Sequence, residues 1–305
     1  MESNLIPSDL RRTLERQHYK LVGNHSAVKT CHWTRVALEG KGVCYKQLWY
    51  GIQSHRCLQM TPNITCCQKC VFCWRSIEAT VLSKLKQFDE PSFIIDECIR
   101  EHRRNISGFL GTEMTSKKLW KEAQQPTNAA ISLLGEPMLY PKISELIDEF
   151  HKRKITTFLV TNSQHPKEME GMSEPTQLYI SLDAPDKATY KKTDRPASKD
   201  YWSRLQKSLE LMNSFRCSKV IRLTLVKGLN MVDPEGYAKL IRLAGEPLVE
   251  AKAFMHVGEA QKRLPRTAMP SHDEVLEFSN ELARHLGYEV AGEQRASRVV
   301  LLKPK

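Results

Sequence analysis

The spacing of apolar and polar residues predicts strands and helices in alternation from residue 125 onward. Short, apolar, β-prone runs predict strands at 129–134, 156–161, 177–182, 219–226 and 249–255. Longer stretches with apolar residues at helical spacing and charges on the opposite face predict helices at 142–153, 202–213, 234–244 and 272–285. Strands and helices in this order are typical of βα units around a parallel sheet.

Six such units are expected once the weaker run at 50–58 is counted as the first strand. Six units predict an α/β fold, a partial (β/α)6 TIM-like barrel open on one side, with functional residues at the C-terminal ends of its strands. We also expect an amphipathic helix in residues 1–20 and an edge strand at 298–303. The expected domains are an N-terminal extension that supplies metal ligands (1–45), the barrel (46–290), and a C-terminal edge strand with its tail (291–305).

The charge balance favours a nucleic acid as partner. The 305 residues include 46 Lys and Arg against 35 Asp and Glu, which gives a net charge of +11 and a pI near 9.2. Such an excess attracts polyanions through counterion release, although a solvated basic surface would give the same sum. The sequence contains no secretory signal and no run of about 18 apolar residues. We therefore expect a cytoplasmic protein without membrane contact.

Nine cysteines are present, and seven of them fall between Cys31 and Cys73. In a cytosolic chain such crowding favours a metal or redox site over disulfides. Cys98 and Cys217 stand apart, and a buried structural thiol is the simpler explanation for each.

Cys66, Cys70 and Cys73 form a C-x3-C-x2-C motif on a short loop. Three thiolates at this spacing can hold three corners of a [4Fe-4S] cubane and leave the fourth iron open to a small chelating molecule. This spacing resembles that of the radical S-adenosylmethionine superfamily, in which the amino acid end of that cofactor takes the open position. Zinc is the alternative because Cys67/Cys70 and Cys70/Cys73 are C-x2-C pairs, but Cys70 cannot serve in both pairs.

Cys31, Cys44 and Cys57 lie upstream at intervals of thirteen residues. Any one of them could be a buried structural thiol. Their polar neighbours, which include His32 and Lys46, suit an electropositive pocket that favours thiolates. We therefore expect these three cysteines to hold a second cluster.

Polar residues follow three of the predicted strands. Gly135, Glu136 and Pro137 come directly after 129–134, and the Glu136 carboxylate could accept hydrogen bonds from the amino group of a bound amino acid. The ribose or the methionine carboxylate of the cofactor could be reached by four further residues. These are Asn162 and Ser163 after the next strand, and Ser181 and Asp183 at the end of the strand after that. An ordinary turn and simple capping residues are the alternatives.

Taken together, these motifs resemble those of the archaeal tRNA 4-demethylwyosine synthases, radical S-adenosylmethionine enzymes of the wybutosine pathway. The resemblance covers nearly the whole chain. Besides the paired three-cysteine sets, the segments that carry it are 44–46, 50–52, 55–57, 70–75, 135–137, 179–184 and 255–258. Two departures are Cys67, directly beside Cys66, and Leu134, where a small polar residue is expected. Either Cys66 or Cys67 could serve as the ligand, and the C-x3-C spacing selects Cys66.

The resemblance implies a reaction of pyruvate with N1-methylguanosine, next to the anticodon of tRNA(Phe), to form the tricyclic base 4-demethylwyosine. It implies two [4Fe-4S] clusters and S-adenosyl-L-methionine, which the reduced cluster at Cys66, Cys70 and Cys73 would split to give a 5′-deoxyadenosyl radical. It also implies that Lys46 forms a Schiff base with pyruvate, although residue physics alone would make Lys46 one more solvated lysine. We expect a monomer that takes electrons from an external donor of the ferredoxin or flavodoxin type.

Residues at or after the late strands are candidates for tRNA contacts, and Trp74 could stack on a base or pack against the cluster. The candidates for phosphate contacts are Arg222, Lys227, Lys252, His256, Gln261, Lys262 and Arg263. Two other interpretations stay open. One is a radical S-adenosylmethionine enzyme that modifies a different RNA base or a peptide, and the other is a zinc-containing RNA-binding module without catalysis.

Overall fold

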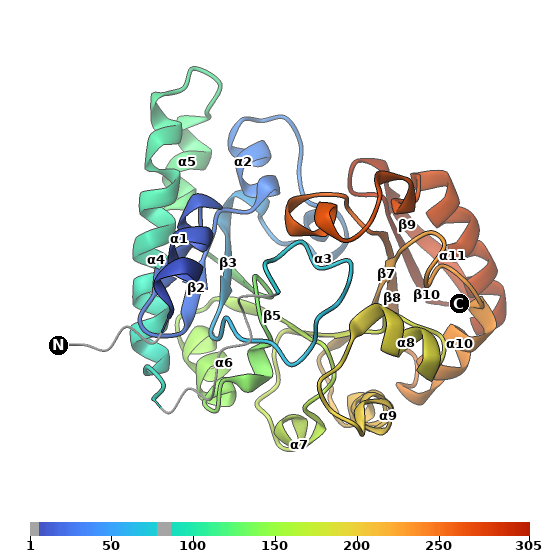
Figure 1. Cartoon of the computed structure of the whole chain (residues 1–305). Helices are drawn as coiled ribbons and strands as arrows, with labels where there is room; N and C mark the ends of the chain where they lie inside the picture. The colour runs from blue at the N-terminus through green and yellow to red at the C-terminus, as the bar shows by residue number, and fades with distance from the viewer. Residues whose placement is uncertain (1–5, 78–86) are drawn as a thin grey trace. The chain divides into compact units, whose positions relative to one another are not determined.

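The computed structural model describes residues 6–77 and 87–305, which have a mixed α/β structure (Figure 1). The chain divides into two compact units. The first unit comprises the described residues of Met1–Cys66, Ala79–Val160 and Met172–Thr176, and the second comprises those of Cys67–Glu78, Thr161–Gly171 and Gln177–Lys305. None of the described helices is long and apolar enough to cross a membrane.

The first unit contains a sheet that begins with an antiparallel hairpin and continues with parallel strands. Its strands are β1 (Lys20–Val22), β2 (Ser26–Val28), β3 (Cys57–Thr61), β4 (Asn128–Ile131) and β5 (Thr156–Thr161), whose last residue belongs to the second unit. Its helices are α1 (Ser8–Arg16), α2 (His32–Leu38), α3 (Tyr45–Tyr50), α4 (Pro91–Ser107), α5 (Lys117–Ala123) and α6 (Ile143–Lys152), with 3-10 turns η1 (Ser54–Arg56), η2 (Gly108–Gly111) and η3 (Pro137–Leu139). β2 pairs antiparallel with β1 and β3, whereas β3, β4 and β5 run parallel.

The second unit contains three more parallel strands and an antiparallel pair. The strands are β6 (Gln177–Ser181), β7 (Ser218–Leu225), β8 (Leu248–Ala253), β9 (Tyr288–Gln294) and β10 (Val299–Pro304). The helices are α7 (Pro166–Met169), α8 (Lys187–Asp194), α9 (Tyr201–Leu211), α10 (Pro234–Leu243) and α11 (His272–Leu286), with 3-10 turns η4 (Met212–Ser214), η5 (Gly258–Lys262), η6 (Arg266–Ala268) and η7 (Arg295–Ser297). β10 lies between β8 and β9 and is antiparallel to both (Figure 1).

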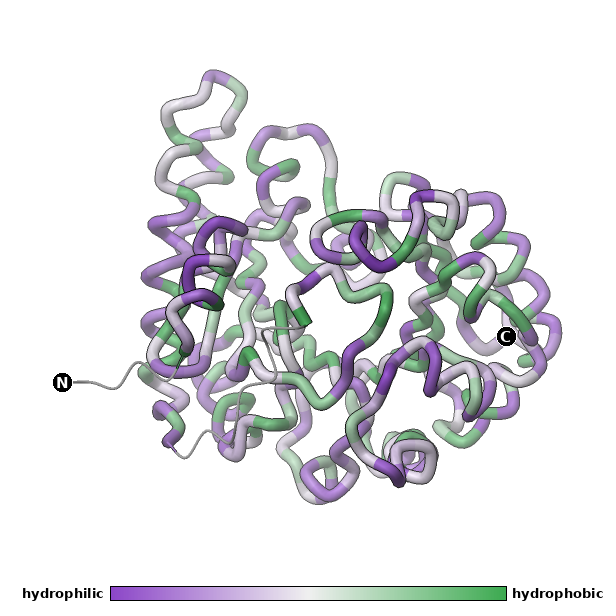
Figure 2. Tube along the Cα trace, in the orientation of Figure 1, coloured by the Kyte–Doolittle hydropathy of each residue, from purple (hydrophilic) through white to green (hydrophobic). Residues whose placement is uncertain are grey.

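Helix α11 illustrates how the local sequence sets an element. The Ser271 side chain accepts a hydrogen bond from the Glu274 N–H, and the Glu274 carboxylate accepts one from the Ser271 N–H, so both donors at the helix start are satisfied. Gly287 ends the helix in the left-handed conformation, with φ of 76°. Figure 2 shows hydrophobic and hydrophilic residues alternating along the helical turns. The buried apolar face of α11 consists of Val275, Phe278, Leu282 and Ala283.

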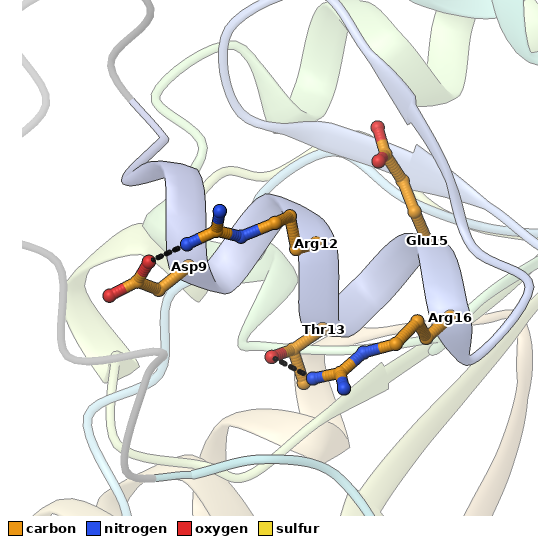
Figure 3. Close-up of a pocket in the computed structure, with 5 residues that line it drawn as sticks. All are labelled: Asp9, Arg12, Thr13, Glu15 and Arg16. Carbon is orange, nitrogen blue, oxygen red and sulfur yellow. Dashed lines mark hydrogen bonds and ion pairs between the residues drawn. The ribbon is translucent and has the colours of Figure 1, made fainter.

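Helix α1 confirms the amphipathic helix predicted near the N-terminus, over Ser8–Arg16. Leu10 and Leu14 are buried in a cluster that also contains Ile64 and Leu133. The opposite face lines a polar hollow, where Arg12 pairs with Asp9 at 2.5 Å and Arg16 donates to the Thr13 hydroxyl (Figure 3). The positive charge of Arg12 is thus partly neutralised by Asp9 within the helix itself.

Two strand predictions are wrong. The run 50–58 is not the first strand, because α3 ends at Tyr50, Gly51 adopts a left-handed φ of 70°, and a 3-10 turn precedes β3 at Cys57. The run 298–303 is a strand but not an edge, because β9 pairs on its outer side. β9 was missed because most of its residues are exposed, which leaves no apolar face to detect. The predicted domain boundaries at 45 and 290 stay predictions.

Candidate functional site

Three cysteines of the first unit stand at the beginnings of successive elements. Cys31 is the N-cap residue of α2, Cys44 is the N-cap residue of α3, and Cys57 is the first residue of β3. Short helices and turns therefore span the thirteen-residue intervals between these cysteines and bring the chain back to the same region of the first unit. Such placement gives each thiol a backbone position fixed by the element that follows it.

Ser54 connects the elements that carry these thiols. Its hydroxyl oxygen accepts a hydrogen bond from the Cys44 N–H at 2.9 Å, and its own N–H donates to the Gln47 side chain at 2.9 Å. Its carbonyl oxygen accepts a hydrogen bond from the Thr34 hydroxyl at 3.0 Å. Because Thr34 lies on α2 and Gln47 on α3, one residue ties both helices to the turn that leads into Cys57.

The electrostatics confirm that these thiols are neighbours. Burial, first, and the nearby Cys31 and Cys44 thiols raise the pKa of Cys57 to about 12. The positive charge of Lys46 and a hydrogen bond from Asn128 act in the opposite direction on the same pKa. Four groups with potential metal or covalent chemistry, three thiols and one amine, therefore lie within electrostatic reach of one another.

Lys46 is buried, which the interpretation as a solvated lysine did not anticipate. Its side chain is 9% exposed, and its Nζ lies 4.8 Å from the ring centroid of Phe158 on β5. Tyr50, at the end of the same helix as Lys46, also packs near Phe158, with ring centroids 6.4 Å apart. An amine held against an aromatic face and away from bulk water is suited to covalent chemistry that water would reverse. Sequence reasoning missed Phe158 because an apolar strand residue carries no chemical signal.

Residues 67–71 of the C-x3-C-x2-C loop run antiparallel to residues 193–197 within the second unit. The Val71 N–H donates to the Thr193 carbonyl at 2.8 Å, and the Lys69 N–H donates to the Asp194 carbonyl at 3.1 Å. The Cys70 thiol lies 3.4 Å from the Asp194 carboxylate. Cys70 and Cys73 belong to this unit and Cys66 to the first, so their joint ligation of one cluster stays a prediction.

The segment after β8 holds the second half of the cysteine loop. We call this contact the Arg263 clasp; it consists of Arg263 and Gly258 together with the backbone carbonyls of the loop that they approach. The Arg263 guanidinium donates to the carbonyl oxygens of Val71, at 3.2 Å, of Cys73, and of Arg75, at 3.3 Å. Gly258 has φ of 57°, and a Cβ there would overlap the Trp74 carbonyl oxygen. Arg263 thus has an internal structural role, and its contact with a phosphate stays a prediction.

Phe72 is the apolar counterpart of this clasp. It packs against the buried cluster of Val226, Phe254, Ala260 and Ala268, which comes from the ends of β7 and β8 and the segment that follows. Full burial of a phenylalanine side chain contributes about 1.5–3 kcal/mol, and the half-buried Phe72 gains part of this. The loop is therefore fixed by its backbone carbonyls and by this side chain together.

Gly135 and Glu136 lie against the chain that enters the loop in the first unit. Gly135 has φ of 70°, and a Cβ there would lie 2.5 Å from the Thr65 carbonyl oxygen and overlap that of Asn63. The Glu136 N–H donates to the Thr65 carbonyl at 2.7 Å, and its buried carboxylate accepts from the Met138 N–H at 3.0 Å. Pro137 begins the 3-10 turn that follows. Only glycine permits the backbone of residues 63–65 to come this close. An ordinary turn at this position would not require a glycine.

The remaining predicted cofactor residues lie in the second unit, and the structure gives each a local role. Asn162 Nδ2 donates to the Cys67 sulfur at 3.4 Å, and the buried Ser163 hydroxyl donates to the Asn162 carbonyl at 2.5 Å. Asp183 is buried and accepts from the Thr224 N–H at 2.7 Å, and burial raises its pKa to about 7. Ser181 is half-buried at the end of β6. Their contact with a cofactor stays a prediction.

Thiolates are the usual ligands of iron–sulfur clusters, and they also bind zinc. Within residues 6–77 and 87–305, no group of three His, Cys, Asp or Glu side chains is arranged to hold a single metal ion. The isolated Cys98 is buried as predicted, whereas Cys217 is only half-buried.

Comparison with known proteins adds to this geometry. A model of the radical SAM superfamily matches residues 60–241, and a model described as wyosine base formation matches residues 243–304. The S-adenosyl-L-methionine-dependent tRNA 4-demethylwyosine synthase of Pyrococcus horikoshii is 48% identical over 304 residues, which cover 97% of this chain and 89% of that protein. The human protein of the same name is 39% identical over 301 residues, which cover 98% of this chain and 41% of that protein.

Two solved structures are similar over almost the whole chain. One is a structure of TYW1 with a lysine-pyruvate adduct bound, with a TM-score of 0.90 and 37% identity over 98% of this chain and 96% of that one. The other is archaeal TYW1, with a TM-score of 0.82 and 34% identity over the same shares of the two chains. Both similarities extend across the two units described above.

Proposed function

Because this chain belongs to the tRNA 4-demethylwyosine synthase family, we propose that it condenses N1-methylguanosine, next to the anticodon of tRNA(Phe), with pyruvate to form 4-demethylwyosine. Membership follows from 48% identity over nearly the full length of an archaeal relative. The chain is a radical SAM enzyme by fold and by sequence, and its C-terminal part carries the wyosine-forming segment.

One observation carries the proposal furthest. Lys46 is a buried lysine, placed against Phe158 and beside the thiols of Cys31, Cys44 and Cys57. A similar structure contains a lysine-pyruvate adduct. A buried amine beside a cysteine set is the feature that a pyruvate-condensing radical enzyme requires and that an RNA-binding module does not.

Lys46 would act as a nucleophile. Its neutral Nζ adds to the keto carbon of pyruvate, the carbonyl oxygen leaves as water after taking up two protons, and an imine remains. The ring of Phe158 and the burial of the side chain keep bulk water from hydrolysing that imine. The proposed role of Lys46 is therefore to hold pyruvate and to activate its keto carbon.

The cofactor assignment is also a proposal. Cys66, Cys70 and Cys73 would hold one [4Fe-4S] cluster, and Cys31, Cys44 and Cys57 would hold a second. The residues assigned to S-adenosyl-L-methionine are Gly135, Glu136, Pro137, Asn162, Ser163, Ser181 and Asp183. When bound, the first cluster and this cofactor supply the one-electron chemistry that opens the methyl C–H bond of the substrate base. The protein contributes position and the exclusion of water.

Trapping with borohydride tests the role of Lys46. Reduction in the presence of labelled pyruvate should attach label to Lys46 in the wild-type protein and none in Lys46→Gln. Lys29 is the matched control, because it is also a partly buried lysine over an aromatic ring, 4.7 Å from the Tyr19 centroid. Lys29→Gln should label like the wild type, and undiminished labelling of Lys46→Gln would exclude the assignment.

An anaerobic assay tests the activity as a whole. Reconstituted protein, methylated tRNA(Phe), pyruvate, S-adenosyl-L-methionine and a reductant should yield 5′-deoxyadenosine and the tricyclic base, followed by mass spectrometry of the digested tRNA. Cleavage of the cofactor without a change in the base would contradict the proposed substrate. We further propose that the enzyme works as a monomer in the cytoplasm and takes electrons from an external ferredoxin or flavodoxin.

A further inference from the structure

Trp74 is a large apolar side chain at the surface, directly after Cys73. It is 39% exposed, although the residues on both sides of it are tightly held. The Arg75 guanidinium carbon lies 3.0 Å from the centroid of the indole ring, and Arg75 itself is only 4% exposed. One face of the ring is therefore backed by a buried cation, while the residue as a whole keeps more than a third of its surface exposed.

The backbone of Trp74 is held from three directions within the second unit. Its carbonyl oxygen accepts a hydrogen bond from the Glu259 N–H at 3.1 Å. The segment that contains Glu259 can come this close because Gly258 has no Cβ. Arg263 binds the carbonyls on either side, those of Cys73 and Arg75. A ring fixed in this way gives up little conformational freedom when something stacks on it.

The segment that holds the Trp74 backbone carries exposed apolar residues and an excess of basic residues. Met255 and Val257, in the segment that leads to Gly258, are 37% and 44% exposed. Residues 252–266 contain four Lys and Arg against one acidic residue, Glu259, so the segment has a net positive charge, although Lys262 pairs with Glu259 at 2.7 Å and Arg263 is directed to the loop carbonyls. An exposed aromatic face within a positively charged surface is complementary to single-stranded nucleic acid, whose bases stack while its phosphates are neutralised.

We propose that Trp74 is a stacking platform for an unpaired nucleobase of the RNA substrate, presented by the Arg263 clasp. The proposal rests on the proposed function, because that function supplies an RNA with unpaired bases beside the modified guanosine. The cation behind the ring polarises its π-system, and the fixed backbone sets its angle. Every base has a π-face, so the platform contributes affinity and position rather than recognition of sequence.

The test measures binding of the methylated anticodon stem-loop to anaerobically reconstituted full-length enzyme, by fluorescence anisotropy, for wild type, Trp74→Leu and Trp74→Tyr. We expect Kd to rise between about 5-fold and 100-fold in the leucine variant and to recover in large part in the tyrosine variant. The slope of log Kd against log salt should stay unchanged in both, whereas Arg266→Gln should lower it by about 1. Phe93→Leu is the matched control, because Phe93 is an aromatic residue of α4 that is 44% exposed, and its Kd should equal that of the wild type.

Four results would overturn the proposal. The first is an unchanged Kd in Trp74→Leu, and the second is an equal loss in Phe93→Leu. The third is loss of iron, or of the spectral response to S-adenosyl-L-methionine, in both Trp74 variants, which would make the indole part of the cluster site. The fourth is weakened reduction by flavodoxin with unchanged RNA affinity, which would assign the surface to the electron donor. Failure of the wild type to convert methylated tRNA would count against the proposed function instead, so the two failures are distinguishable.

Discussion

Substitution of Gly135 by alanine tests how the chain is packed where it enters the cysteine loop. Gly135 has φ of 70°, and an alanine Cβ would meet the carbonyl oxygens of Asn63 and Thr65, the latter at 2.5 Å, and the Ile64 carbonyl carbon at 2.7 Å. All three atoms are backbone, so no side-chain rotation can relieve the overlap. The segment 63–65 has to move, and Cys66 is the next residue.

The expected loss has two parts. A left-handed conformation costs an alanine about 1–2 kcal/mol relative to glycine, and overpacking against backbone adds about 1–3 kcal/mol. Gly171→Ala separates the two, because Gly171 has nearly the same φ, 71°, and no described neighbour lies within 4 Å of the place that an alanine methyl group would take. Gly171→Ala should therefore lose only the conformational part of the free energy of unfolding, about 1–2 kcal/mol.

The assay is urea unfolding of the reduced apoprotein under argon, together with iron per chain after reconstitution. We expect Gly135→Ala to unfold at a lower urea concentration than Gly171→Ala and to bind less iron, while Gly171→Ala binds as much as the wild type. Equal destabilisation of the two variants would refute the argument, because the steric part would then be absent. Normal iron binding by a strongly destabilised Gly135→Ala would refute the link to Cys66.

Two further predictions concern the first unit. Burial lowers the pKa of His102 to about 4, below the 6.5 of the unfolded chain, so its stabilising contribution is complete above pH 6.5 and is lost as the pH falls toward 4. Between pH 7 and pH 5 this single group should lower the free energy of unfolding of the apoprotein by about 2 kcal/mol. His102→Gln should therefore flatten the dependence of the urea midpoint on pH. An unchanged pH dependence in this variant would contradict the prediction. Ser54→Ala removes the acceptor of the Cys44 N–H and should cost about 1–2 kcal/mol. It should also lose the iron of the proposed second cluster and keep the cofactor cleavage assigned to the first, and full iron content would be evidence against the role of Ser54.

The sequence predicted well the elements whose burial leaves a strong apolar pattern. The strand predictions at 177–182, 219–226 and 249–255 correspond to β6, β7 and β8, and the partial-barrel fold class is confirmed by the similarity to solved structures. The hairpin of β1 and β2 was missed because its strands have only three residues each, too few for a period to appear. Helix α4 was not predicted, although its buried residues Ile94, Ile95, Cys98, His102 and Ile106 recur at helical spacing.

For the site, the motif spacing identified the residue types, but only the folded chain shows what they touch. The position of Lys46 against Phe158 depends on two segments more than a hundred residues apart in sequence, which no local pattern records. Arg263 is a second example. As a basic residue after a late strand it was a candidate for phosphate contacts, and no feature of the sequence indicates that its guanidinium binds three backbone carbonyls that would otherwise need water.

The Arg263 clasp also connects the two segments of this chain that the two family models match. The residue that grips the cysteine loop lies in the wyosine-forming segment, and the loop lies in the segment shared with the whole superfamily. Removal of the contacts of Arg263 would leave the second half of the cysteine loop without this support. In this chain the segment matched by the wyosine model therefore also holds the cysteine loop that lies in the radical SAM segment.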